Sequence, residues 1–156
     1  AETDQLTGLL NRRSFEQRLQ QKLQQLPADQ QLSLGLLDID YFKRYNDFYG
    51  HLDGDLVLVQ LSRLLSAESG LLVVRFGGEE FVLLLPGSNL STAHDKAQQL
   101  CQTLQQLQPE GINTSVSIGV ACLSTAREEY FDEVFARADK ALYLAKQQGR
   151  NRVCAA

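Results

Sequence analysis

Apolar residues recur at helical spacing in four stretches of this 156-residue chain. In each stretch, apolar side chains three or four positions apart are separated by polar residues, which is typical of an amphipathic helix. Pro27 and Gly149 interrupt the pattern, as expected at helix ends. The pattern predicts helices over 12–26, from the turn at 40–43 to the break at Ser69-Gly70, over 91–107 with Ser91 as its cap, and over 130–148.

Short apolar runs predict the strands. They cover residues 32–39, 71–76, 81–85 and 113–122. The second and third runs are joined by Gly77-Gly78-Glu79-Glu80, and paired glycines between closely spaced strands indicate a hairpin. The order strand, helix, hairpin, helix, strand is that of a split βαβ unit. We therefore expect one α+β domain over 1–156, ferredoxin-like, with a central antiparallel-rich sheet flanked by helices.

This topology brings two acidic pairs together. A right-handed crossover places the third strand antiparallel between the first two, so the exit of the first strand lies beside the hairpin tip. Asp38 and Asp40 at that exit would then converge with Glu79 and Glu80 at the tip. Mutual repulsion of carboxylates is relieved by a divalent cation, and Mg²⁺ shares oxygen ligands with substrate phosphates. The sequence predicts a metal-nucleotide site, although each acidic pair alone is more typical of a cap or an exposed turn.

Basic residues mark a place for phosphates. Lys43 lies at the start of a predicted helix, whose free backbone N–H groups attract anions. Lys146 and Arg150 flank the helix-ending Gly149 and would reach the same phosphates if that end folds over the site. The alternative is that they only complement the dipole of their own helix.

A polar, glycine-punctuated segment, residues 46–55, interrupts the second predicted helix. Its Asp55 carboxylate is suited to accept hydrogen bonds from N1–H and the exocyclic amine of guanine, with the Asn46 amide as a second contact. Guanine fits this pair better than adenine does. A merely kinked helix with capping Asn and Asp residues is the alternative.

Composition and net charge narrow the classes of partner that this chain is expected to bind. The net charge of -4 argues against broad binding to nucleic acid or anionic lipid, and no run approaches the roughly 20 apolar residues that cross a bilayer. Cys101, Cys122 and Cys154 form no CxxC pair, which favours reduced, packed thiols in the cytoplasm. We expect no nucleic acid partner and no membrane contact from this segment.

At this point the motifs together resemble those of the GGDEF domain family of diguanylate cyclases, whose fold is related to the palm of nucleotidyl cyclases. The resemblance runs from Asp4 to about Val153. It is carried by five collinear motifs: 4–12 (DQLTGLLNR), 38–43 (DIDYFK), 46–55 (NDFYGHLDGD), 77–81 (GGEEF), and 138–143 (ADKALY) with Lys146 and Gly149-Arg150-Asn151.

The resemblance implies an activity and a metal site. Two GTP molecules, one on each of two facing domains, are joined into cyclic di-GMP with release of two pyrophosphates, so a homodimer and Mg²⁺ or Mn²⁺ are implied. By matching position, Asp38 and Glu79 are metal ligands, and Ile39 contributes its backbone carbonyl. Glu80 lies near the metal or at a second metal. Glu79, or Glu80 in its place, assists deprotonation of the attacking 3′-hydroxyl.

The resemblance also implies substrate contacts. Asn46 and Asp55 match the guanine contacts, and His51 a nearby position. Matches to the triphosphate contacts are Phe42, Lys43, Lys146 and Arg150. An upstream sensor domain outside this chain is expected. The alternative function is a catalytically silent GTP-binding regulatory module, against which the intact acidic residues and Lys43 argue.

One family feature is missing. Many members carry an Arg-x-x-Asp motif for product inhibition shortly before the signature loop, and here that stretch reads Glu68-Ser69-Gly70-Leu71. The charge at its first position is reversed and the acid at its last position is gone. We expect product feedback through this site to be absent.

Overall fold

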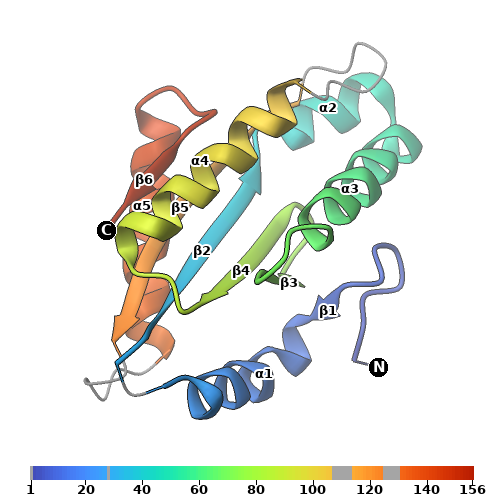
Figure 1. The fold of residues 1–156 in the computed structure, drawn as a ribbon. Helices are drawn as coiled ribbons and strands as arrows, with labels where there is room; N and C mark the ends of the chain where they lie inside the picture. The colour runs from blue at the N-terminus through green and yellow to red at the C-terminus, as the bar shows by residue number, and fades with distance from the viewer. Residues whose placement is uncertain (1, 28, 107–113, 125–130) are drawn as a thin grey trace.

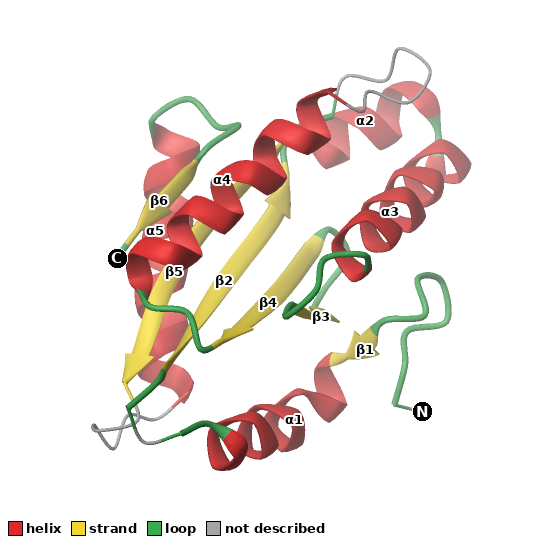
Figure 2. Ribbon diagram, in the orientation of Figure 1, coloured by secondary structure: helices red, strands yellow, loops and turns green. Residues whose placement is uncertain are grey.

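A mixed sheet of six strands forms the centre of the molecule (Figures 1 and 2). The structure is a computed structural model, and it describes residues 2–27, 29–106, 114–124 and 131–156. The strands are β1 (Leu10–Asn11), β2 (Gln31–Ile39), β3 (Leu72–Arg75), β4 (Glu80–Pro86), β5 (Val116–Ser124) and β6 (Val153–Ala155). Their order is β1-β3-β4-β2-β5-β6, with β2 antiparallel to both β4 and β5 and with parallel pairs at the two edges.

Helices cover both faces of the sheet (Figure 2). They are α1 (Arg12–Gln25), α2 (Phe42–Tyr49), α3 (His51–Ser66), α4 (Leu90–Gln106) and α5 (Phe131–Gln147). Buried residues of α2, α3 and α4 pack with Leu37 and Ile39 of β2, whereas those of α1 and α5 pack with Leu34 and Leu36. Because both faces are buried, β2 is an almost continuous apolar run rather than an alternating one.

The predicted topology is confirmed. Strand β4 lies between β2 and β3 and is antiparallel to both, so Asp38 at the end of β2 is directly opposite Glu80 at the start of β4. Val116, Ile118 and Val120 are all buried, as their alternation predicts. The predicted ends at Leu107, Asn113 and Tyr130 lie outside the described residues.

Three details of the prediction are wrong. The long second helix is two helices, because Gly50 takes a φ of 91° between α2 and α3. Asn89, not Ser91, caps α4, since its Oδ1 accepts a 2.8 Å hydrogen bond from the Thr92 amide. Leu56, assigned to the buried face, is 56% exposed. Strands β1 and β6 were not predicted; with two and three residues they are too short to show a period.

Two further observations bear on the sequence predictions. No described helix is long and apolar enough to cross a bilayer. The cysteines are free thiols, and burial, followed by the charge of Asp40, raises the pKa of Cys101 to about 12. Because its thiol stays protonated, Cys101 serves as a packed core residue, as predicted.

Gly119 sets the distance between β5 and α5. A Cβ atom there would overlap the backbone of α5, lying 2.8 Å from the Leu142 Cα and closer still to the Ala138 carbonyl oxygen. At Gly35 in β2, by contrast, a Cβ would meet only Leu83 and Ile118 side chains, at 3.5 to 3.6 Å. Close docking of α5 on the sheet therefore requires glycine at 119 and not at 35.

We expect Gly119→Ala to lower the free energy of unfolding by about 2 kcal/mol or more, because rigid backbone rather than a flexible side chain must move. Urea denaturation measures the change. Gly35→Ala, the matched control on the neighbouring strand, should lose less than about 1 kcal/mol. Equal losses in the two variants would contradict this account of α5 docking.

Candidate active site

Asp38 is the buried acid at the end of β2. Its side chain lies on the α5 side of the sheet, and Lys146 Nζ of α5 donates a hydrogen bond to Oδ2 and forms an ion pair with it. The other oxygen, Oδ1, is buried and has no hydrogen-bond partner. A buried carboxylate oxygen without a partner is costly, so Asp38 has an unfilled capacity to bind a cation or donor.

Glu79 completes an acidic cluster at the hairpin turn. Its main-chain oxygen accepts a 3.3 Å hydrogen bond from the Ile39 amide, which ties the turn to the end of β2. Partial burial, then the charges of Asp38 and Glu80, raise the pKa of Glu79, while Lys146 opposes them. Asp38, Glu79 and Glu80 therefore interact electrostatically, as the topology predicted.

Asp40 is not part of this cluster, which corrects the prediction that all four acids converge. Its carboxylate accepts hydrogen bonds from the Ser115 and Ser117 hydroxyls, both at 2.6 Å, and from the Asn151 amide at 3.0 Å. Located just past the end of β2, Asp40 is directed toward β5 and the turn after α5. It therefore holds that turn against the sheet.

The residues present fit a divalent cation. Among the described residues, no group of three His, Cys, Asp or Glu side chains is arranged to hold a metal unaided. The unpartnered Oδ1 of Asp38 and the repulsion felt by Glu79 would nevertheless both be relieved by a cation. The Ile39 carbonyl and phosphate oxygens of a substrate are the kind of ligand that would complete such a site.

A clamp that the sequence did not predict shapes the hairpin turn. Arg75 donates hydrogen bonds to the carbonyl oxygens of Gly77 (3.2 Å) and Gly78 (2.9 Å), and forms a 2.9 Å ion pair with Asp4. Burial opposes the Asp4 charge, but hydrogen bonds from Thr7 and Arg75 outweigh it and lower the pKa of Asp4. The N-terminal motif thus fixes the turn that carries the glutamates.

The end of α5 reaches this edge of the sheet. Lys146 contacts Asp38 of the acidic cluster, whereas Arg150 donates a 3.4 Å hydrogen bond to the hydroxyl of Tyr41, just past the end of β2. Lys43 is exposed in the first turn of α2. Phe42 is 7% exposed and packs in the core, which leaves its main chain as the part available to a phosphate.

The predicted base contacts lie between α2 and α3. Asn46 faces Gly54, where any Cβ would overlap its Oδ1, so glycine at 54 is needed for this approach. The Asn46 Oδ1 is buried and has no hydrogen-bond partner. Asp55 and His51 are both exposed on α3. The break at Gly50 therefore brings the unpartnered Asn46 Oδ1 close to the segment that carries the exposed Asp55 carboxylate.

A sheet of this topology, with acids where its central strand meets the hairpin, defines a palm-like nucleotidyl cyclase fold. The family model described as "Diguanylate cyclase, GGDEF domain" matches residues 1–152. The chain therefore belongs to the GGDEF family of diguanylate cyclases.

Named relatives and solved structures support the same family membership. Diguanylate cyclase DgcM of Escherichia coli (strain K12) is 48% identical over 160 residues, covering 100% of this chain and 38% of that protein. DgcZ of the same strain is 40% identical, over 96% of this chain and 51% of its own length. The GGDEF domain of DgcB from Caulobacter crescentus, solved in complex with c-di-GMP, gives a TM-score of 0.87 at 33% identity, over 99% of this chain and 95% of that one. The chain thus spans about half or less of these curated relatives.

Glu79→Gln should stabilise the fold at neutral pH. Because its folded pKa is raised, the ionised form of Glu79 destabilises the native state above that pKa, and the penalty disappears below the unfolded value. The urea midpoint of Glu79→Gln should therefore exceed that of the unmutated chain at pH 7 and approach it near pH 4. Glu80→Gln, at the exposed neighbouring position, should gain less. An unchanged or lower midpoint at pH 7 would contradict the assignment.

Proposed function

We propose that this chain is an active diguanylate cyclase domain, which joins two GTP molecules into cyclic di-GMP and releases two pyrophosphates. One observation carries the proposal: at the sheet edge the buried Asp38 has an oxygen without a partner and lies beside two further carboxylates, Glu79 and Glu80. A merely structural domain gains nothing from such repulsion. Membership of the family supports the same conclusion.

We assign the metal site to Asp38, Glu79 and the Ile39 carbonyl, with Glu80 beside it. Mg²⁺ or Mn²⁺ held there would neutralise triphosphate charge and stabilise the leaving pyrophosphate. Lys146, which pairs with Asp38, would add a positive charge for a phosphate bound at this edge.

The reaction is an in-line substitution. The 3′-oxygen of one GTP attacks the α-phosphorus of the other, a new P–O bond forms, and the bond to the bridging oxygen of pyrophosphate breaks. The proton of the 3′-hydroxyl passes to the carboxylate of Glu79, or of Glu80 in its place. A second, equivalent step closes the ring.

Recognition of GTP follows from the polar groups between α2 and α3. The Asp55 carboxylate accepts from N1–H and the exocyclic amine of guanine, and the Asn46 amide supplies a second contact, with His51 nearby. Adenine has no N1–H to donate. Lys43, Lys146, Arg150 and the main chain at Phe42 bind the triphosphate.

A second copy of the chain is needed because one domain holds one GTP and lacks a nucleophile. Leu52 and Leu56 flank Asp55 on one face of α3 and are 82% and 56% exposed; Phe48 of α2 is 81% exposed. Apolar side chains exposed beside the substrate site support a protein contact there. An upstream sensor domain that brings two copies together is part of the proposal.

Turnover tests the proposal directly. Purified chain is incubated with GTP and Mg²⁺ at several protein concentrations, and pyrophosphate and cyclic dinucleotide are followed. Glu79→Gln should lower turnover at least about 100-fold while GTP affinity changes only a few-fold. Glu16→Gln, an exposed acid on α1, is the matched control. A concentrated dimer that binds GTP and forms neither product would instead indicate the silent regulatory module.

Asp55→Ala should relax base choice. Removal of the carboxylate takes away the acceptor for N1–H, so the preference for GTP over ATP should fall about tenfold or more. Competition between the two nucleotides measures it. Asp47→Ala, an exposed acid on α2, should keep the preference. Equal use of GTP and ATP by the unmutated chain would refute the guanine assignment.

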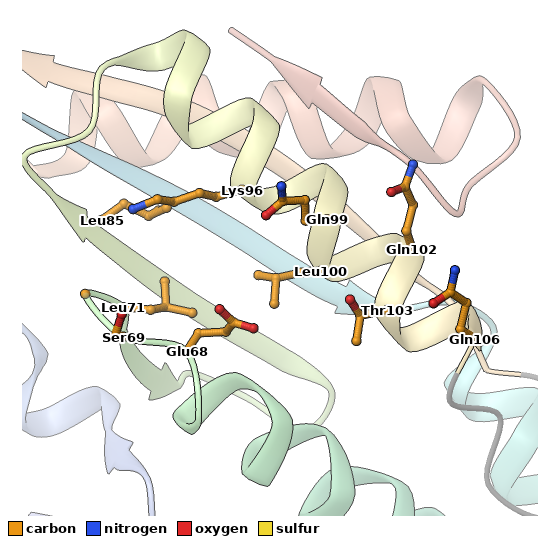
Figure 3. A pocket seen from close by; sticks show the side chains of 11 residues that line it. Glu68, Ser69, Leu71, Leu85, Lys96, Gln99, Leu100, Gln102, Thr103 and Gln106 are labelled. Atoms are coloured by element: carbon orange, nitrogen blue, oxygen red, sulfur yellow. The ribbon is translucent and has the colours of Figure 1, made fainter.

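Product feedback should be absent. Glu68 and Leu71, which replace the family's Arg and Asp, line a cavity of about 410 Å³ beside α4, with Lys96 as its cation and Leu100 directed into it (Figure 3). An acidic side chain at 68 repels the two phosphates of cyclic di-GMP. The product should therefore give no noncompetitive inhibition, whereas Glu68→Arg combined with Leu71→Asp should introduce it. Noncompetitive inhibition that is abolished by a mutation at 68 or 71 would contradict this.

A further inference from the structure

Tyr41 joins two arginines that are more than a hundred residues apart. The guanidinium carbons of Arg150 and Arg44 lie 4.5 and 4.9 Å from the centroid of its ring, and an Arg150 N–H donates a 3.4 Å hydrogen bond to the ring hydroxyl. The ring itself is 53% exposed. Tyr41 stands between β2 and α2, three residues after the metal-site candidate Asp38.

The backbone around this contact is strained in a way seen nowhere else in the described residues. Tyr41, Arg150 and Asn151 are the non-glycine residues there with positive φ, at 56°, 65° and 49°. Left-handed backbone is disfavoured for a non-glycine residue, because its Cβ crowds the following carbonyl oxygen. The Asn151 amide is tied to Asp40 within the same corner. Strain that gathers at one place is typical of a functional site.

The Tyr41 ring holds two cationic side chains at one corner of the molecule. An aromatic face stabilises a nearby cation only weakly, and a guanidinium carries several N–H donors, so both groups keep donors for a further partner. An anion suits them best, because the planar guanidinium fork matches phosphate oxygens. The chemistry of the two groups held at Tyr41 therefore favours a multiply charged anion as their ligand.

We propose that Tyr41 is a positioning residue, and that it holds Arg44 and Arg150 as a paired clamp for the polyphosphate end of the nucleotide. Arg44 was not predicted as a substrate contact, and nothing in its helical position marks it as one. The inference rests on the proposed function, because the clamp serves the same GTP whose base is placed at Asp55.

The test counts phosphates. Calorimetry measures the affinities of GMP, GDP and a non-hydrolysable GTP analogue in the presence of Mg²⁺. Tyr41→Asn removes the ring, and asparagine tolerates left-handed backbone, so no strain is added. Its affinity for the GTP analogue should fall about fivefold, while its affinity for GMP stays within twofold. Tyr41→Phe keeps the ring and should retain most of the preference for three phosphates.

A double-mutant cycle shows whether the residues act together. Arg44→Gln should give a similar loss, and the Tyr41→Asn loss should shrink once Arg44 is already replaced, because the two act through one clamp. In steady-state assays the KM for GTP should rise more than kcat falls. Tyr143→Gln is the matched control, because Tyr143 is also an exposed tyrosine but lies on α5. This variant should bind the GTP analogue as tightly as the unmutated chain does.

The outcomes separate the two levels of proposal. Equal loss of GMP and GTP-analogue affinity in Tyr41→Asn, or full additivity with Arg44→Gln, overturns the clamp and leaves the cyclase assignment standing. Failure of the unmutated chain to bind any guanine nucleotide overturns both. Selective loss of phosphate discrimination, with rescue by phenylalanine, supports the clamp.

Discussion

The ion pair between Asp38 and Lys146 connects the fold to the site. Asp38 ends a strand that is buried on both faces, where an unpaired carboxylate is strongly disfavoured. Its counter-charge comes from α5, more than a hundred residues later in the chain, and α5 reaches it only because Gly119 lets the helix dock closely on β5. The counter-charge of this buried acid therefore depends on how the far end of the chain packs against the sheet.

Asp38 and Asp40 show how hydrogen-bond partners determine the role of an acidic side chain. The Asp40 carboxylate has three donors, so its charge is satisfied and it organises the turn after α5. The Asp38 carboxylate has one donor, Lys146, and its Oδ1 has no hydrogen-bond partner. Both stand in the same acidic motif. What separates a structural acid from a candidate ligand here is the number of donors that the neighbouring strand and turn provide.

Sequence reasoning succeeded where the signal is local and periodic. The alternation of Val116, Ile118 and Val120 and the glycine-rich hairpin define the strands, and the handedness of the crossover then brings Asp38 next to Glu80. Sequence reasoning failed where the interacting residues lie far apart in the sequence. Neither the serines that satisfy Asp40 nor the contact of Tyr41 with Arg150 leaves a pattern in the sequence, because each depends on segments more than 70 residues apart.

The unsatisfied groups of the protein are gathered in one segment. Among the described residues, the buried side-chain polar atoms without a partner are Asp38 Oδ1, Tyr45 OH and Asn46 Oδ1, all within nine residues of chain. The strained residues Tyr41 and Arg150 meet in the same region. Polar groups elsewhere could be satisfied by the protein itself, so their concentration between the end of β2 and α2 indicates groups that are completed from outside the chain. The proposed nucleotide with its cation would supply charge, phosphates and a base in that order along the segment, and so would meet all of these needs at once.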